Sequence, residues 1–208
     1  MQRLLILVCA FLGVTLGATA ASAQFYIGGH GGANFLQDSD FSGDSGNDGT
    51  ASFDAGYVVG GFAGYRFGLT EALSVDVEGE FSYRNNDIDK ISVSGFPNSD
   101  GESQSFAWMA NGWLNWQIGD SGFIPYVGGG FGGVHVDVNN ANVGGVRLEG
   151  ESDFMIGGQV GGGLGYLIGE HVEVSLDYRF LITEDASLNS VDVEYQSHSV
   201  MLGLRYLF

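Results

Sequence analysis

Side chains along this chain alternate between apolar and polar at every second position. The clearest case covers residues 73–84, where Asp76, Glu78 and Glu80 lie between apolar or glycine residues. A period of two is typical of a β-strand with one apolar face, because successive side chains of a strand point in opposite directions. The same alternation recurs in four more stretches, residues 57–67, 108–117, 173–180 and 195–208.

Three further strands are expected over residues 25–35, 123–136 and 154–167, which brings the number to eight. The first two of these are rich in glycine, so their pattern leaves open which face is apolar. The chain has 36 glycines, which argue against a helical bundle because each glycine in a helix costs about 1 kcal/mol. The sequence therefore predicts an all-β fold.

The connections between these strands alternate in length. The short ones cover residues 68–72, 118–122 and 168–171, and the long ones cover residues 36–54, 85–103, 137–152 and 181–194. Three short and four long connections suit an up-and-down barrel of eight antiparallel strands, in which the short turns and both chain ends lie on one side. Membrane barrels have short periplasmic turns and longer extracellular loops.

The amino terminus predicts a secretory signal peptide over residues 1–23. Arg3 precedes an apolar run from Leu4 to Gly17, and Ala21-Ser22-Ala23 forms a small-residue cleavage pattern. A membrane anchor is the alternative, but the run is shorter than the roughly 20 residues that a spanning helix needs. Residues 24–208 then form one domain, the barrel, without disulfides, because Cys9 is the only cysteine.

The strand pattern alone also fits a soluble barrel of the lipocalin type, which keeps its apolar face inside. The signal peptide, the loop lengths and the last strand favour the membrane. That strand alternates up to the terminal Phe208, and it resembles the insertion signal of bacterial outer-membrane β-barrels. The residues that carry this resemblance are Leu202, Leu204, Tyr206 and Phe208.

Nearly all of the expected mature chain, from residue 24 onwards, resembles the small outer-membrane barrels of the outer-membrane protein A/X and opacity type, a porin-like family. The stretches that carry the resemblance are residues 24–29, 125–130, 176–180 and the last strand. It implies an all-β, eight-stranded antiparallel up-and-down transmembrane β-barrel in the outer membrane of a Gram-negative cell, with periplasmic termini. Its expected partners are outer-membrane lipid and lipopolysaccharide, and the barrel-assembly machinery during insertion.

An apolar outer face would turn the charged face inward. The charges predicted to lie in the interior are Arg66, Asp76, Glu78, Glu80, Arg84, Glu173, Asp177, Arg179 and Arg205. Side chains fill an interior of eight strands, and an unpaired buried charge costs several kcal/mol. We therefore expect a plug of salt bridges, with Arg66 diagonal to Asp76 and with Arg205 near Glu173 and Asp177. A gated ion path is the alternative.

The chain carries 25 acidic and seven basic residues, a formal charge of −18. Nucleic acid is therefore not an expected partner, because binding it needs clustered Lys and Arg. The remaining acids concentrate in the long connections, which predicts a solvated acidic surface open to an unknown extracellular ligand. Divalent cations are an alternative ligand. The stretch from Asp38 begins like a calcium loop, but Gly49 stands where the bidentate Glu belongs.

Other motifs give weaker signals. Residues 128–133 spell a dinucleotide-binding loop, but the helix that this loop requires does not follow. The four histidines are scattered, which predicts no metal site. Ser197-His198-Ser199 suggests a hydrolase, but neighbouring strand residues point to opposite faces. We expect no cofactor and no enzyme activity, but a structural or surface-interaction protein. A small-solute channel is the alternative, and a lipid-modifying enzyme is a weaker one.

Overall fold

The computed structural model describes residues 23–36, 39–42, 48–53, 55–93, 101–139, 142–143, 146–147, 152–183, 186–188, 191–193 and 196–208. The predicted signal peptide lies outside these residues, except that Ala23 begins the first strand. Eight long strands form the body of the molecule: β1 (Ala23–Leu36), β4 (Gly56–Gly68), β5 (Leu73–Val93), β6 (Gly101–Trp116), β7 (Phe123–Asn139), β10 (Ser152–Ile168), β11 (Val172–Thr183) and β14 (Gln196–Leu207).

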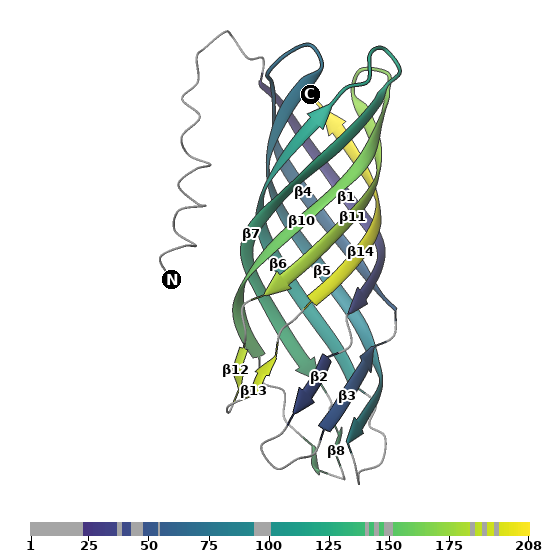
Figure 1. The fold of residues 1–208 in the computed structure, drawn as a ribbon. Helices are drawn as coiled ribbons and strands as arrows, with labels where there is room; N and C mark the ends of the chain where they lie inside the picture. The colour runs from purple at the N-terminus through teal and green to yellow at the C-terminus, as the bar shows by residue number, and fades with distance from the viewer. Residues whose placement is uncertain are drawn as a thin grey trace.

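These eight strands close into a ring. Each pairs antiparallel with the next long strand along the chain, and β14 returns to pair with β1, where Leu207 lies opposite Tyr26. Figure 1 shows the strands tilted around a central axis, with the amino-terminal β1 beside the carboxyl-terminal β14. The predicted eight-stranded antiparallel up-and-down barrel is confirmed. No helix in the described part of the chain is long and apolar enough to cross a membrane.

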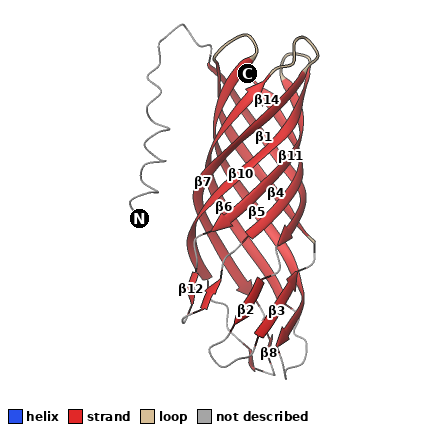
Figure 2. Ribbon diagram, in the orientation of Figure 1, coloured by secondary structure: helices blue, strands red, loops and turns tan. Residues whose placement is uncertain are grey.

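The two ends of the barrel differ. Short turns over residues 69–72, 117–122 and 169–171 join strands at the end where the carboxyl terminus lies, the upper end in Figure 2. Gly119 and Gly169 have φ of 49° and 69° in these turns, a conformation that glycine adopts without steric cost. At the opposite end lie the short strands β2 (Ser39–Ser42), β3 (Asp48–Phe53), β8 (Asn142–Val143), β9 (Val146–Arg147), β12 (Ala186–Leu188) and β13 (Val191–Val193).

The predicted bounds of one long connection, residues 85–103, were wrong, whereas the other three lie within about three residues of the ends of the long strands. Strand β5 continues to Val93 and β6 begins at Gly101, so most of the connection predicted over residues 85–103 is paired strand. In the first long connection β3 pairs with the extended part of β5, and β2 pairs with β3. Residues 85–93 are largely polar at both odd and even positions. The alternation that marks a strand therefore stops there, although the backbone pairing continues.

The outer face of the strands is apolar and exposed, whereas the inner face carries buried polar residues. On β5, Val77 and Phe81 are exposed on the outer face, whereas Asp76 and Glu78 are buried inside. The two glycine-rich strands follow the same rule: Tyr26 on β1 and Tyr126 on β7 point inward.

Glycines on β7 allow close approach of the neighbouring strand. A Cβ on Gly128 would lie 2.0 Å from the carbonyl oxygen of Gly112, and one on Gly130 would lie 2.1 Å from Oδ1 of Asn111. Residues 128–133 thus continue a strand and form no nucleotide loop.

Candidate functional site

Polar residues from several strands gather on the axis of the barrel. Strand alternation places every second side chain of β5 and β11 inside, and the closed ring brings these strands face to face. The structure places all nine predicted charges there. Eight of them are at most 8 % exposed: Asp76, Glu78, Glu80, Arg84, Glu173, Asp177, Arg179 and Arg205. The ninth, Arg66, has 12 % of its side chain exposed.

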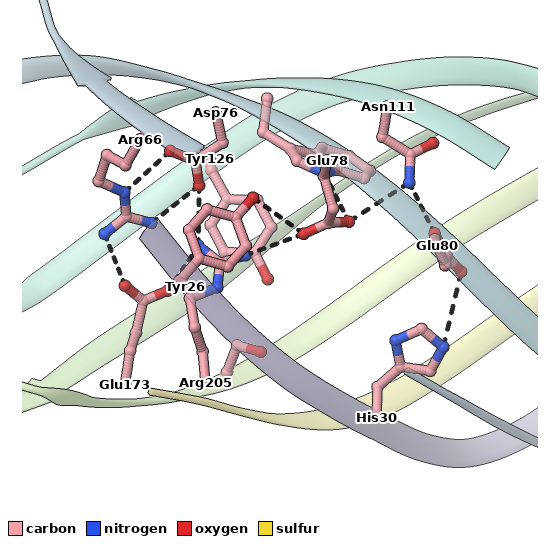
Figure 3. A network of polar contacts seen from close by, with 12 residues as sticks. Tyr26, His30, Arg66, Asp76, Glu78, Glu80, Asn111, Tyr126, Glu173 and Arg205 are labelled. Atoms are coloured by element: carbon pink, nitrogen blue, oxygen red, sulfur yellow. Dashed lines mark hydrogen bonds and ion pairs between the residues drawn. The ribbon is translucent and has the colours of Figure 1, made fainter. Parts of the chain in front are cut away.

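Four of these charges form a compact group near the short turns (Figure 3). Arg66 donates to Asp76 through Nε and Nη2, both at 2.9 Å, and through Nη1 to Glu173 at 2.8 Å. Arg205 donates through Nη1 to Oδ2 of Asp76 at 2.8 Å and lies 3.5 Å from Glu173. Two guanidinium groups thus face two carboxylates, which neutralises this part of the interior.

The predicted geometry of this group was partly wrong. Arg66 lies directly opposite Asp76 in the register of β4 and β5, not diagonal to it. The turn over residues 69–72 sets this register, and the direct pairing permits the two-pronged contact. Arg205 lies opposite Glu173, but its other carboxylate partners are Asp76 and Glu78, whereas Asp177 binds other groups.

Glu78 lies at the centre of the network. Its Oε2 accepts hydrogen bonds from the hydroxyl of Tyr26 at 3.1 Å and from Nη2 of Arg205 at 3.4 Å. Its Oε1 accepts from the indole of Trp113 at 3.2 Å and from Asn111 at 3.3 Å. The guanidinium of Arg205 also lies 4.1 Å from the centre of the Tyr26 ring, a cation–π contact. One carboxylate therefore connects four strands.

A second group surrounds Glu80, farther from the short turns. Its Oε2 accepts hydrogen bonds from Arg179, from Asn111 at 2.7 Å and from Gln159 at 3.0 Å. The other oxygen, Oε1, lies 3.6 Å from Nε2 of His30, and neither atom has a hydrogen-bond partner.

Asp177 and Arg84 have separate surroundings. Asp177 accepts hydrogen bonds from Tyr126 and, at 2.8 Å, from Ser175. Arg84 lies nearer the long connections and donates to Ser82 at 2.9 Å. In addition, the side chain of Asn34 links Ser199 to Asn86 by hydrogen bonds. The described interior therefore carries hydrogen-bonded polar layers from one end to the other.

Apolar side chains fill the space between the polar groups. Tyr26, Phe62 and Leu207 form one buried cluster. Ala107, Met109, Val134 and Leu181 form a second. Close packing of this kind leaves few gaps larger than a water molecule. The arrangement suits a plug that holds the strands in register.

Several members of the network were not among the predicted site residues. Asn111 and Trp113 alternate with outward residues on β6, so their inward direction was readable, but their contact with Glu78 depends on a neighbouring strand. Tyr26 and Tyr126 lie on the glycine-rich strands, where no sequence signal identified the inner face. Gln159 is opposed by glycine on β7, which leaves room for its amide.

Possible chemistry elsewhere is limited in the residues that the structure describes. No group of three or more His, Cys, Asp or Glu side chains is arranged there to hold a metal ion. Ser197 and Ser199 are buried inside, whereas His198 lies on the outer face against Tyr178. The acids at positions 38, 44 and 54 lie outside the described residues, and no side chain at positions 37–54 is described.

The outer face carries the predicted insertion residues. Leu202, Leu204, Tyr206 and Phe208 are 45–70 % exposed and point away from the interior. Near the short turns the ring of Phe208 contacts Phe25 at 5.4 Å and Tyr206 at 4.9 Å between centroids, and Phe25 contacts Tyr65 at 5.3 Å. This aromatic belt covers the neighbouring strands β4, β1 and β14 at the end of the barrel that carries the carboxyl terminus.

Comparison with known proteins agrees with this architecture. The model of the outer membrane protein beta-barrel domain matches residues 6–206. Neisserial surface protein A superposes with a TM-score of 0.55 at 21 % identity, over 90 % of this chain and 99 % of that one. This similarity shows the same fold. No curated protein matches the chain.

Two other barrels superpose with lower scores. Ail, the attachment invasion locus protein of Yersinia pestis, has a TM-score of 0.46 at 16 % identity, over 90 % of this chain and 99 % of that chain. The outer membrane enzyme PagL has a TM-score of 0.47 at 15 % identity, over 86 % of this chain and 97 % of that chain.

Proposed function

Because the chain belongs to the family of outer membrane protein beta-barrel domains, we propose that it is a structural or surface-interaction protein of the Gram-negative outer membrane, closed to solutes. In this proposal residues 1–23 are a signal peptide, and residues 24–208 form the inserted domain. The residues from Leu202 to Phe208 direct insertion by the barrel-assembly machinery, and outer-membrane lipid and lipopolysaccharide surround the apolar outer face.

The observation that carries this proposal is the pairing of the interior charges. An open channel needs water along its axis, and wide barrels of 16 or more strands provide it. Here Asp76, Glu78 and Glu80 each contact an arginine. Asp177 also lies 4.0 Å from a guanidinium nitrogen of Arg179. Opening an ion path along the axis would separate these pairs, and a buried charge without its partner costs several kcal/mol. The network therefore favours a plug over a channel.

The proposed orientation places the short turns and both termini in the periplasm. Membrane barrels of this kind have short periplasmic turns and longer extracellular loops. The extensions of β5 and β6, together with β2 and β3, then lie outside the cell at the base of the long connections. These connections carry acids such as Asp44 and Asp54, and they would meet an extracellular ligand.

Conductance separates the plug from the channel. We expect the purified full chain, inserted in planar lipid bilayers, to show no steady openings at neutral pH. The matched comparison is the Arg66→Ala/Arg205→Ala variant, which removes both guanidinium groups facing Asp76 and should admit water and ions. Steady large openings of the unmodified protein would refute the plug.

Topology is tested separately on intact cells. Added protease should cut only in the connections that include residues 37–55, 94–100, 140–151 and 184–195, and mass mapping locates each cut. Deleting one connection at a time and measuring binding to host or abiotic surfaces then tests the interaction role. Cuts within residues 69–72 or 117–122 would reverse the proposed orientation.

A further inference from the structure

A polar pair interrupts the apolar outer face of the barrel. Tyr178 on β11 and His198 on β14 share a hydrogen bond of 2.7 Å between the phenolic oxygen and Nδ1. The imidazole lies 4.8 Å from the ring of Phe180 between centroids. Phe35 of β1 lies opposite His198 in the register and is itself exposed. The histidine is thus held between aromatic residues and faces outward.

The hydrogen bond occupies Nδ1 and leaves Nε2 as the ring nitrogen that faces away from Tyr178. Where the Tyr178 hydroxyl donates to an unprotonated Nδ1, the proton of a neutral His198 lies on Nε2. A charged imidazolium also has a proton on Nε2. In both states Nε2 is a donor, and it has no hydrogen-bond partner among the described residues.

The position of His198 along the barrel matches the boundary of the membrane. Ten residues separate it from Phe208, which lies in the aromatic belt near the short turns. At ~3.3 Å per residue and a strand tilt of ~40°, ten residues rise about 25 Å, the height of the apolar band of an outer-membrane barrel. If Phe208 lies at one boundary, His198 lies at the other.

Charge on the outer face is scarce in the described residues. All four arginines whose side chains are described, Arg66, Arg84, Arg179 and Arg205, point into the interior. A lipid phosphate at the long-connection end therefore meets no described guanidinium. The outward Nε2 of His198 lies at this end of the barrel, and an N–H to phosphate hydrogen bond gains strength from the charge of the acceptor.

We propose that Nε2 of His198 binds a phosphate group of a lipopolysaccharide molecule in the outer leaflet, with Tyr178 as the positioning residue. The inference deepens the proposed function and depends on its orientation, because only that orientation turns His198 towards lipopolysaccharide. The flanking rings of Phe35 and Phe180 contact the sugar and the first acyl carbons below the phosphate.

The test uses the folded full chain in detergent and measures lipid binding by native mass spectrometry. The probes are the lipid part of lipopolysaccharide with its phosphates, the same lipid after enzymatic dephosphorylation, and phosphatidylglycerol. We expect His198→Phe, which keeps an aromatic ring beside Phe180, to weaken binding of the phosphorylated lipid about ten-fold, as for the loss of one hydrogen bond to a charged group. Binding of the dephosphorylated lipid should not change.

Two further variants make the test specific. His171→Phe is the matched control, because His171 lies at the short-turn end beside Tyr206, with 5.7 Å between ring centroids. This variant should bind the phosphorylated lipid as the unmodified protein does. Tyr178→Phe keeps the ring but removes the hydroxyl that orients the imidazole, and should weaken binding about three-fold. A heat-dependent shift in electrophoretic mobility verifies that each variant is folded.

Three results would overturn the proposal. Unchanged binding by His198→Phe would remove His198 as the site, and an equal loss for phosphorylated and dephosphorylated lipid would remove phosphate as the ligand. Equal affinity of the unmodified protein for phosphatidylglycerol would remove lipopolysaccharide as the source. An inverted topology on intact cells would show instead that the proposed orientation is wrong, independently of the results of the lipid-binding measurements.

Discussion

The inner and outer faces of β5 differ in how closely each residue is specified. Inside, Asp76 accepts hydrogen bonds from Arg66 and Arg205 at distances of 2.8–2.9 Å. Outside, Val77 and Phe81 are exposed on an apolar surface, and under the proposed function the lipid acyl chains around it would accept most apolar shapes. The inner face thus needs particular atoms at particular places, whereas the outer face needs only an apolar surface without unpaired polar groups. Substitutions on the inner face should therefore lower the free energy of unfolding most. Substitutions on the outer face should lower it only when they introduce a charge.

The largest effect is expected for Asp76→Ala. This change leaves Arg66 and Arg205 facing each other with Glu173 as the remaining shared carboxylate, and breaking a buried pair from one side costs about 3–5 kcal/mol. Reversible unfolding in guanidinium in the presence of detergent micelles or lipid measures the loss. The double variant Asp76→Leu/Arg66→Met removes both partners and should recover most of it. Equal losses in the single and double variants would contradict the pairing argument.

The next largest effect is expected when a charge is placed on the outer face. Leu176 on β11 is 54 % exposed, and Arg at this position should cost about 2–4 kcal/mol if the residue faces the bilayer midplane. Unfolding from lipid vesicles measures this cost, and Leu176→Met is the control that keeps the face apolar. A cost near zero would mean that water, not lipid, covers this face.

A smaller effect separates the two faces of β6. Trp113 is buried and donates its indole N–H to Glu78, whereas Trp108 is 50 % exposed on the outside. Trp113→Phe should cost about 1–3 kcal/mol, because it removes a donor from a buried carboxylate. Trp108→Phe keeps an apolar ring against lipid and should cost less than about 0.5 kcal/mol. The same unfolding measurement is made on both variants. A larger loss of stability for Trp108→Phe than for Trp113→Phe would contradict the comparison.

The sequence predicted the strands correctly where the outer face is apolar and the inner face is polar. On β5 and β11 the two environments differ, so Asp76 and Asp177 stand out against apolar neighbours. Beyond Arg84 no such contrast remains, and the continuation of β5 to Val93 left no periodic signal, although its backbone pairs with β6 and β3.

The partners inside the barrel were harder to predict than their direction. Alternation shows that Glu78 points inward, but not that Tyr26, some 50 residues earlier, donates to it. That contact depends on the registers of two strand pairs, and a shift of one residue would turn every side chain of a strand to the other face. The Arg66–Asp76 contact shows the same limit on a small scale, because the length of one turn decides between a direct and a diagonal pair.

The pairing of β1 with β14 also has a kinetic consequence. Tyr26 and Leu207 are neighbours in the ring although nearly the whole chain separates them, and Arg205 reaches Asp76 across 129 positions. Contacts between such distant segments form slowly, since the entropy of closing a long loop opposes them until the ring is complete. During that interval the arginines and carboxylates of the interior lack their partners. We therefore expect the pairing of β1 with β14 to be the last and slowest step of folding. A variant that weakens this pairing should accumulate as an open sheet that proteases cleave.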